Sequence, residues 1–387
     1  MTLDPDPLQG HVDGRLIRGG TSKGFFVTPS AFPDVEGELR DKLLLEMFGS
    51  PDPLQIDGIG GSISSTSKFM LVERSDRDGI DVDYTFGQVA VDQPAVDWSG
   101  NCGNLTSAIG TYALKEKLAP VDGNPTTVTL YNTNTDTRIE QSIPIDEGVP
   151  TPYGDYAIDG VPGTGARVDS KFFDPAGGVF GSLTPTGNFR ETIAVEGDEY
   201  EVSLVDATNP CVFVRADDLG LSGTELPTEI SERDGLLETL ELIRGTMCER
   251  LGLVDDARDA RSERPTIPFV AFVSEPQSYE DSLGGHVDAA EIDVTARVIT
   301  TQAPHHAYAM TGAMCLAAAA QLKETIPNEV SQETTESVTI GHPKGKITVG
   351  VEASETAIQS VTVGRTVREL VRGSVSYRYI DGLEQLR

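Results

Sequence analysis

Short runs of apolar and β-branched residues recur along the chain, often alternating with polar residues, and this pattern is typical of β-strands. The runs end at Gly, Pro, Asp or Asn, which favour turns. In the first half they are LIRGG, KGFFVT, KFMLVE, IDVDYTFGQVAVD, TTVTLYN and RIEQSIPI. The pattern predicts that each half of the chain is rich in β-sheet.

Other segments show helical spacing instead. In the segment that starts near 101–104 and runs to 118, the apolar residues recur every three or four positions, which predicts one amphipathic helix. The segment 305–324 is apolar nearly all round, so we expect its helix to be buried in a sheet that wraps it. Further helices are predicted at 38–48 and 236–251.

The two halves of the chain resemble each other faintly. GTSKGFFV at 20–27 matches ATNPCVFV at 207–214, and LTSAIGTYAL at 105–114 matches MTGAMCLAAA at 310–319. Three further matches keep the same order, which indicates a tandem duplication. We therefore expect two similar α+β domains, at 1–185 and 186–387, joined through the Gly- and Pro-rich segment 174–188.

The charge excludes some partners. The chain has 61 Asp and Glu against 30 Lys and Arg, a formal net charge of −31, which argues against nucleic acid and anionic membranes as partners. Lysine is especially scarce. At about 1 M salt the Debye length is only about 3 Å, so carboxylates scarcely repel one another. Our hypothesis is a cytoplasmic protein of a halophile.

Cysteine usage agrees with a reducing compartment. The four cysteines are widely spaced without any CxxC pattern, so neither a disulfide framework nor a zinc site is indicated. The amino-terminal residues are acidic and polar, unlike a secretory signal, and the longest apolar stretch, near 314–320, is too short to span a bilayer. We expect a soluble intracellular protein.

The loop SGNCGN at 99–104 carries the first candidate chemistry. Small residues before a helix leave backbone N–H groups free, and together with the helix dipole these form an anion site. Cys102 in this position would have its thiolate favoured. The alternative is a helix cap with a small buried thiol, and the sequence favours neither.

A second loop, GGSISSTSK at 60–68, ends in one of the few lysines. A lysine partly withdrawn from water can serve as a base near neutral pH, whereas the alternative is a surface lysine at the start of a strand. The scarcity of lysine favours the functional role for Lys68. In RGGTSKG at 18–24, Arg18, Ser22 and Lys23 are candidates for binding a carboxylate, although a tight turn also explains the glycines.

The remaining motifs are weaker. GIGG at 58–61 lacks the strand–loop–helix frame of a dinucleotide site. His305 and His306 lie at the expected start of the second helix. The sequence supports two roles for them about equally: an imidazole that faces a ligand, or a structural histidine. His342 fits a turn. The five histidines show no metal-ligand spacing, so we expect no metal.

These motifs in this order (RGGTSKG, SSTSK, SGNCGN, DATNPCVFV, HHAYAMTGAMC, GHPKG) resemble the PrpF family, from about Arg15 to Arg372. That family contains methylaconitate isomerases, with relatives that isomerise methylitaconate or tautomerise oxalomesaconate. The resemblance implies a diaminopimelate-epimerase-like α+β fold, in which two similar domains each roll a sheet around a central helix. It also implies an active site in the cleft between the domains.

The repeat then argues against a racemase with two thiols. Cys102 falls opposite Ala307, and Cys315 lies eight residues further on, about 12 Å along a helix at about 1.5 Å per residue. Lys23 and Lys68 fall opposite Pro210 and Pro268. We therefore expect the first domain to carry the acid–base groups and the second to supply binding contacts.

Such asymmetry suits an allylic proton shift in an unsaturated di- or tricarboxylate. The reaction needs one base, a donor for reprotonation and positive potential for the intermediate, without a metal or organic cofactor. By resemblance Lys68 matches the proposed base, and Cys102 a cysteine whose necessity is less certain. The expected substrate contacts are Arg18, Thr21, Ser22, Lys23, Ser65, Thr66, Asn101, Gly103, Asn104, Asn209, His306, Thr311 and Gly312.

Three alternatives stay open: a tautomerase of an oxo-acid such as oxalomesaconate, a racemase or epimerase, and an accessory protein that assists a dehydratase. The sequence does not distinguish methylaconitate from aconitate or methylitaconate. A small carboxylate is the expected partner, and a homodimer is one candidate assembly.

Overall fold

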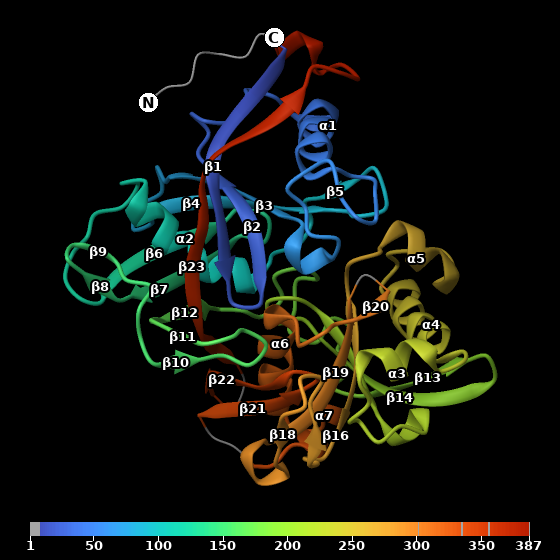
Figure 1. Ribbon diagram of the computed structural model, residues 1–387. Coiled ribbons are helices and arrows are strands. Elements are labelled where there is room, and N and C mark those ends of the chain that lie inside the picture. The colour runs from blue at the N-terminus through green and yellow to red at the C-terminus, as the bar shows by residue number, and fades with distance from the viewer. Residues whose placement is uncertain (1–7, 301, 334–335, 355–356, 387) are drawn as a thin grey trace. The chain divides into compact units, whose positions relative to one another are not determined.

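The computed structural model describes residues 8–300, 302–333, 336–354 and 357–386, which form two compact units (Figure 1). The first unit contains the described residues up to Tyr156, Thr164–Val168 and those from Arg365 onward. The second contains Ala157–Gly163 and the described residues of Asp169–Gly364. The predicted boundary at residue 185 is therefore wrong.

The end of the chain explains part of this correction. Strand β23 (Ile358–Arg378) begins in the second unit, where it pairs with β22 (Gly345–Ala353). It then pairs antiparallel with β1 (Gln9–Gly19), from Val367 opposite Gly19 to Arg378 opposite Gln9. This pairing returns the carboxyl-terminal residues to the first unit.

The Gly- and Pro-rich segment 174–188 does not link the two units. Asp206 holds it within the second unit, because its Oδ2 accepts hydrogen bonds from the backbone N–H groups of Val179 and Phe180. The backbone N–H of Asp206 donates to the carbonyl of Leu183. The composition correctly indicated a loop but not its attachment.

The first unit is a sheet around helix α2 (Gly103–Lys115), whose residues from Gly103 to Leu114 are all buried. Gln141 fixes the helix to the sheet, since it accepts from the N–H of Gly110 and donates to the carbonyl of Thr106. Pairing runs β1–β2 antiparallel, β2–β3 parallel, β3–β4 antiparallel, β4–β6 parallel and β6–β7 antiparallel. The bounds are β2 (Ser22–Val27), β3 (Lys68–Arg74), β4 (Val82–Val89), β5 (Val96–Asp97), β6 (Thr126–Asn132), β7 (Thr137–Ile143), β8 (Ile145–Asp146), β9 (Val149–Pro150), β11 (Thr164–Gly165) and α1 (Gly37–Phe48). Strands β10 (Tyr156–Ala157) and β12 (Arg167–Phe173) begin in this unit and end in the second.

The second unit repeats this pattern around helix α6 (Met310–Ala320), which is buried along its whole length. Pairing runs β14–β15 antiparallel, β15–β16 parallel, β16–β19 antiparallel, β19–β21 parallel and β21–β22 antiparallel. The same order of pairings in both units confirms the predicted duplication. The bounds are β13 (Glu191–Val195), β14 (Asp198–Val205), β15 (Cys211–Arg215), β16 (Phe269–Ser274), β17 (Tyr279–Glu280), β18 (His286–Val287), β19 (Val294–Thr300), β20 (Ala303–Pro304), β21 (Ser337–His342), α3 (Pro227–Glu232), α4 (Leu236–Arg250), α5 (Ala260–Glu263) and α7 (Ile326–Val330).

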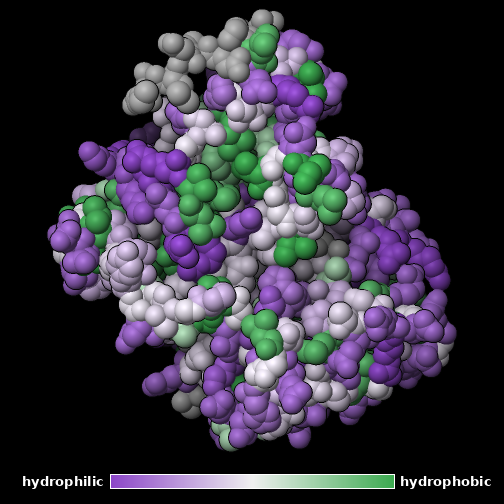
Figure 2. All heavy atoms as spheres, in the orientation of Figure 1, coloured by the Kyte–Doolittle hydropathy of each residue, from purple (hydrophilic) through white to green (hydrophobic). Residues whose placement is uncertain are grey.

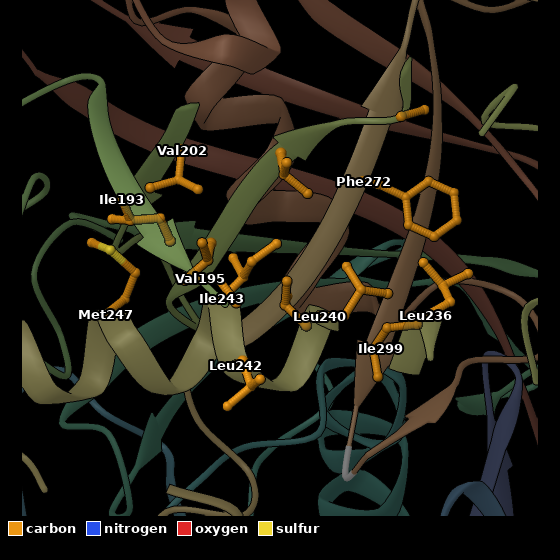
Figure 3. Close-up of a cluster of buried hydrophobic side chains, with 14 of the residues drawn as sticks. Ile193, Val195, Val202, Leu236, Leu240, Leu242, Ile243, Met247, Phe272 and Ile299 are labelled. Carbon is orange, nitrogen blue, oxygen red and sulfur yellow. The ribbon is translucent and has the colours of Figure 1, made fainter. Parts of the chain in front are cut away.

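The predicted helices 38–48 and 236–251 are confirmed as α1 and α4. Figure 3 shows how α4 packs, with Leu236, Leu240, Ile243 and Met247 directed at the sheet of the second unit. Their spacing of three and four residues places them on one side of the helix. The role of α4 is therefore structural: its apolar side packs on the sheet.

Helix α6 starts later than predicted, at Met310, so His305 and His306 are not at its first turn. The backbone N–H of Ala307 donates to Nδ1 of His305, which makes a side-chain turn, and Ala309 is extended with φ −61° and ψ 124°. The apolar pattern overestimated the helix because it contains no signal for this turn.

Candidate active site

The amino-terminal ends of β2 and β3 meet the start of α2 in the first unit. The two strands are parallel neighbours, with Gly24 opposite Lys68. Ser22, Gly24 and Phe26 face α2, as the 5.5 Å distance between the ring centroids of Phe26 and Tyr112 shows for the last of them. Because side chains alternate along a strand, Lys68 also faces the helix.

Cys102 is the N-cap residue of α2, and its side chain is nearly buried. Its Sγ lies 3.9 Å from Oγ of Ser22. The geometry thus brings together Cys102 and Ser22, two of the residues that the sequence predicted.

The other three cysteines are wholly buried, and burial raises the pKa of Cys211, Cys248 and Cys315. The repeat placed Ala307 opposite Cys102, whereas the N-cap residue of α6 is Ala309, two residues further on. Within the described residues, a thiol therefore lies at the start of one central helix and not of the other.

Lys68 is 8% exposed at the first position of β3. Its Nζ donates to Oε1 of Gln88 over 2.5 Å and lies 5.1 Å from the ring centroid of Phe86. Sequence reasoning missed Gln88. The signal for it is indirect: Gln88 is the residue opposite Lys68 across β3 and β4.

The RGGTSKG loop is tied to α2 by Asn104. The Nδ2 of Asn104 donates to Oγ1 of Thr21 over 3.1 Å, and its Oδ1 accepts from Nε of Arg365 over 3.2 Å. Asn104 was expected to contact substrate, but these partners give its side chain a role in holding the loop. Arg365 was also missed; burial lowers its pKa to about 10.

Arg18 and Lys23 lie opposite each other across β1 and β2. Lys23 alternates with Ser22, so this pair is on the face of the sheet away from α2 and from Lys68. Nη1 of Arg18 donates to the backbone carbonyl and to Oγ1 of Thr366. Burial, with a smaller effect of Arg368, lowers the pKa of Arg18.

Ser65 and Thr66 lie in the 3₁₀ helix η1 (Ser64–Thr66), directly before Lys68. Ser65 is buried, and Oγ1 of Thr66 donates to the carbonyl of Ile63. Gln55 holds this loop, because its Oε1 accepts from Oγ of Ser67 over 2.6 Å. The hydroxyl cluster seen in the sequence is therefore in part a scaffold for Lys68.

Asn101 and Gly103 flank the thiol. The Nδ2 of Asn101 donates to the hydroxyl of Tyr84 over 3.1 Å, and its Oδ1 accepts from Oγ1 of Thr106 over 3.1 Å. Gly103 is the first residue of α2 and is buried. Asn101 thus fixes the turn that presents Cys102.

The second unit contains the other predicted contacts. Asn209 is buried just before β15, and its Oδ1 has no hydrogen-bond partner among the described residues. Thr208 donates from Oγ1 to the carbonyl of Thr311, the second residue of α6. Gly312 follows in α6, packed near Phe269. Burial and a smaller effect of Lys344 lower the pKa of His306 to about 4.

Two further findings concern the described part of the chain. It contains no group of three or more His, Cys, Asp or Glu side chains arranged to hold a metal ion. None of its helices is both long and apolar enough to cross a membrane.

The chain is similar to known isomerases over nearly its whole length. It is 37% identical to the 3-methylitaconate isomerase of Eubacterium barkeri, covering 95% of this chain and 96% of the relative. It is 38% identical to the 2-methyl-aconitate isomerase of Shewanella oneidensis, with 95% and 97% covered. The 4-oxalomesaconate tautomerase of Pseudomonas putida is 36% identical, with 93% and 94% covered.

Solved structures confirm the predicted fold. The crystal structure of a methylitaconate-delta-isomerase matches with a TM-score of 0.82 at 36% identity, covering 96% of each chain. A hydroxyproline epimerase from Agrobacterium vitis shares the fold at a TM-score of 0.52 and 13% identity, with 96% and 94% covered. The model of the PrpF protein family matches residues 9–378, and the chain is an isomerase that belongs to the PrpF family.

Proposed function

We propose that this protein moves a proton, and with it a double bond, in an unsaturated tricarboxylic acid such as 2-methylaconitate or aconitate. Two observations carry the proposal: a nearly buried lysine, Lys68, starts β3 and faces the side of the sheet on which α2 lies, and Cys102 caps the start of α2 beside Ser22 of the neighbouring strand β2. The named relatives support it: one is an isomerase of 2-methyl-aconitate, a tricarboxylate, and another an isomerase of 3-methylitaconate, an unsaturated dicarboxylate.

In the proposed reaction the neutral amine of Lys68 removes a proton from a carbon that is flanked by a C=C bond and a carboxylate. The electron pair of that C–H bond enters the conjugated system and gives a dienolate. Backbone N–H groups at the start of α2 stabilise its negative charge. Reprotonation at the other end of the system, or at the same carbon after rotation, completes the isomerisation and returns the proton.

The proposed roles of the remaining residues follow from their positions. Cys102 and Ser22 lie together at the helix start and are the candidates for a proton donor and a carboxylate contact. Because the substrate carbon is already acidified by its C=C bond and carboxylate, we propose that one lysine base suffices without a metal or organic cofactor. The contacts predicted for Asn209, His306 and Thr311 remain proposals.

A second candidate function is the tautomerisation of an oxo-acid, favoured by the similarity to the tautomerase of Pseudomonas putida. Both reactions use the same base and differ in whether the proton moves between carbons or between carbon and oxygen. The choice between them therefore depends on the substrate that the protein accepts.

Ultraviolet absorbance of the purified protein with a panel of unsaturated tricarboxylates and oxo-acids tests the proposal. We expect turnover of cis- or trans-methylaconitate or aconitate, with deuterium from D2O incorporated into the product. Turnover of oxalomesaconate alone would favour the tautomerase, exchange on a chiral amino or hydroxy acid would favour a racemase, and a requirement for an added dehydratase would favour an accessory protein.

A further inference from the structure

We propose that Gln88 is a positioning residue that orients the amine of Lys68 for proton abstraction, an inference that rests on the proposed function. Gln88 and Lys68 are opposite each other on β4 and β3. Both side chains face α2, since Tyr84, four residues before Gln88 on the same strand, contacts Thr106 of that helix.

The carboxamide of Gln88 has one allowed orientation. Its Nε2 lies within hydrogen-bond distance of three backbone carbonyl oxygens, at 3.1 Å, 3.0 Å and 3.3 Å, which belong to Ser64, Ser67 and Val89. Turning the amide by half a rotation would place Oε1 against these oxygens. Oε1 must therefore face Lys68, whose Nζ donates to it.

This arrangement is suited to a base. A neutral amide oxygen accepts an N–H from either the ammonium or the amine form of lysine, whereas a carboxylate would form an ion pair that stabilises the ammonium. With one N–H directed at Gln88, the tetrahedral geometry of the neutral amine fixes where its lone pair points. The ring of Phe86, two residues before Gln88 on β4, bounds the amine from the same strand.

The titratable side chains that β4 and α2 direct at their common interface include Tyr84 and Tyr112, and Cys102 caps α2. Burial raises the pKa of both tyrosines, so they stay neutral near pH 7. The adjacent strand β2 carries Lys23, which faces the other side of the sheet. No ion pair of Lys68 occurs within the described part of the chain.

Two variants of Gln88 test the proposal through the pH dependence of kcat/KM. Gln88→Glu adds a negative charge beside the amine, so the midpoint of the rise in activity should move up by about one pH unit, with activity recovered at alkaline pH. Gln88→Met removes the acceptor and the orientation. Its kcat should fall by about 10²-fold at every pH while KM stays within about twofold.

Gln141→Met is the matched control. Like Gln88, Gln141 is a strand glutamine whose carboxamide bonds to neighbouring backbone in this unit, but it is fully buried and bonds to Gly110 and Thr106 of α2. We expect a loss of stability without a change in the pH profile. The proposal would be overturned if both Gln88 variants kept the wild-type pH dependence of kcat/KM. It would also be overturned if Gln88→Met and Gln141→Met lost the same kcat at equal folded fraction.

A second measurement separates this inference from the proposed function. Competitive labelling of the folded protein with acetic anhydride, quantified by peptide mass spectrometry, follows the reactivity of Lys68 against pH without any substrate. We expect its midpoint to move up in Gln88→Glu and stay unchanged in Gln141→Met. If the wild type turned over no acid in the panel, the proposed function would fail, but the labelling would still test the role of Gln88. If the labelling midpoint of Lys68 did not move in Gln88→Glu, that role would be refuted even in an active enzyme.

Discussion

Oδ1 of Asn104 occupies the place where a side chain on Gly20 would begin. A Cβ on Gly20 would lie 2.1 Å from that oxygen, and Gly20 has a φ of +51°, in the left-handed region that favours glycine. The absence of a side chain at Gly20 thus lets the loop approach the first turn of α2. This close approach fixes Thr21 and, through the chain, Ser22 beside the thiol.

We therefore expect Gly20→Ala to lower the free energy of unfolding by about 2–4 kcal/mol, from backbone strain and from displacement of Asn104. Gly37→Ala is the matched control, because Gly37 has a φ of +54° but a Cβ added there would meet no described atom within 4 Å. It should cost only about 1 kcal/mol. Urea unfolding of both variants gives the comparison, and equal losses would contradict the contact with Asn104.

Lys68→Ala should abolish isomerase activity, by about 10³-fold or more in kcat, since no other amine faces α2 at this edge of the described sheet. The fold should remain intact because the side chain is at the end of a strand. Steady-state assays with circular dichroism test this. Lys23→Ala is the control on the opposite face of the sheet, and retained turnover in Lys68→Ala would refute the assignment.

Cys102→Ser should be milder than Lys68→Ala, with a loss of about 10–100-fold, because a hydroxyl can keep the contact with Ser22 but is a poorer proton donor than a thiol. Comparing product formation with deuterium exchange from D2O shows which proton transfer is slowed. A loss as complete as that of Lys68→Ala would instead support catalysis by the thiol.

The sequence predicted the parts of the fold that depend on local patterns. The presence of α2, the burial of α6, the limits of α1 and α4, and the placement of Lys68 and Cys102 at a strand start and a helix start all follow from short-range periodicity and loop composition. The pattern of α2 predicted an amphipathic helix, whereas its residues from Gly103 to Leu114 are all buried. The order of strand pairings also repeats as the internal duplication predicted.

What the sequence did not predict depends on distant pairings. β23 returns to β1 across more than 340 residues, and no local pattern specifies that register. For the same reason Arg365 could not be matched with Asn104, which is 261 residues away. Gln88 and Lys68 are only 20 residues apart, but matching them requires the register of β3 against β4, which the local pattern does not specify. Asn104 was expected to bind substrate as part of the loop SGNCGN, and the structure gives its side chain partners within the chain, Thr21 and Arg365.

Acid should destabilise the second unit in part through His306. Its pKa is lowered to about 4 from an ordinary value of 6.5, chiefly by burial, so between these pH values the unfolded chain binds a proton that the folded chain does not. The unfolding free energy that the neutral His306 leaves intact above pH 6.5 therefore decreases as the pH falls from 6.5 toward 4. His306→Gln should show a smaller loss of unfolding free energy than the wild type between pH 7 and pH 5, as measured by urea denaturation. An equal loss in both proteins would show that His306 does not titrate in this way.

Salt should stabilise the protein. Acidic residues outnumber basic ones by 61 to 30, and hydrophilic side chains cover much of the face seen in Figure 2. Raising KCl from 0.1 M to 1 M shortens the Debye length from about 10 Å to about 3 Å, which weakens repulsion between carboxylates. The free energy of unfolding at pH 7 should therefore rise with KCl, and it should rise less at pH 5, where part of the carboxylates are protonated. Urea denaturation over this range of KCl measures the effect, and equal stability in 0.1 M and 1 M KCl would contradict a halophilic adaptation.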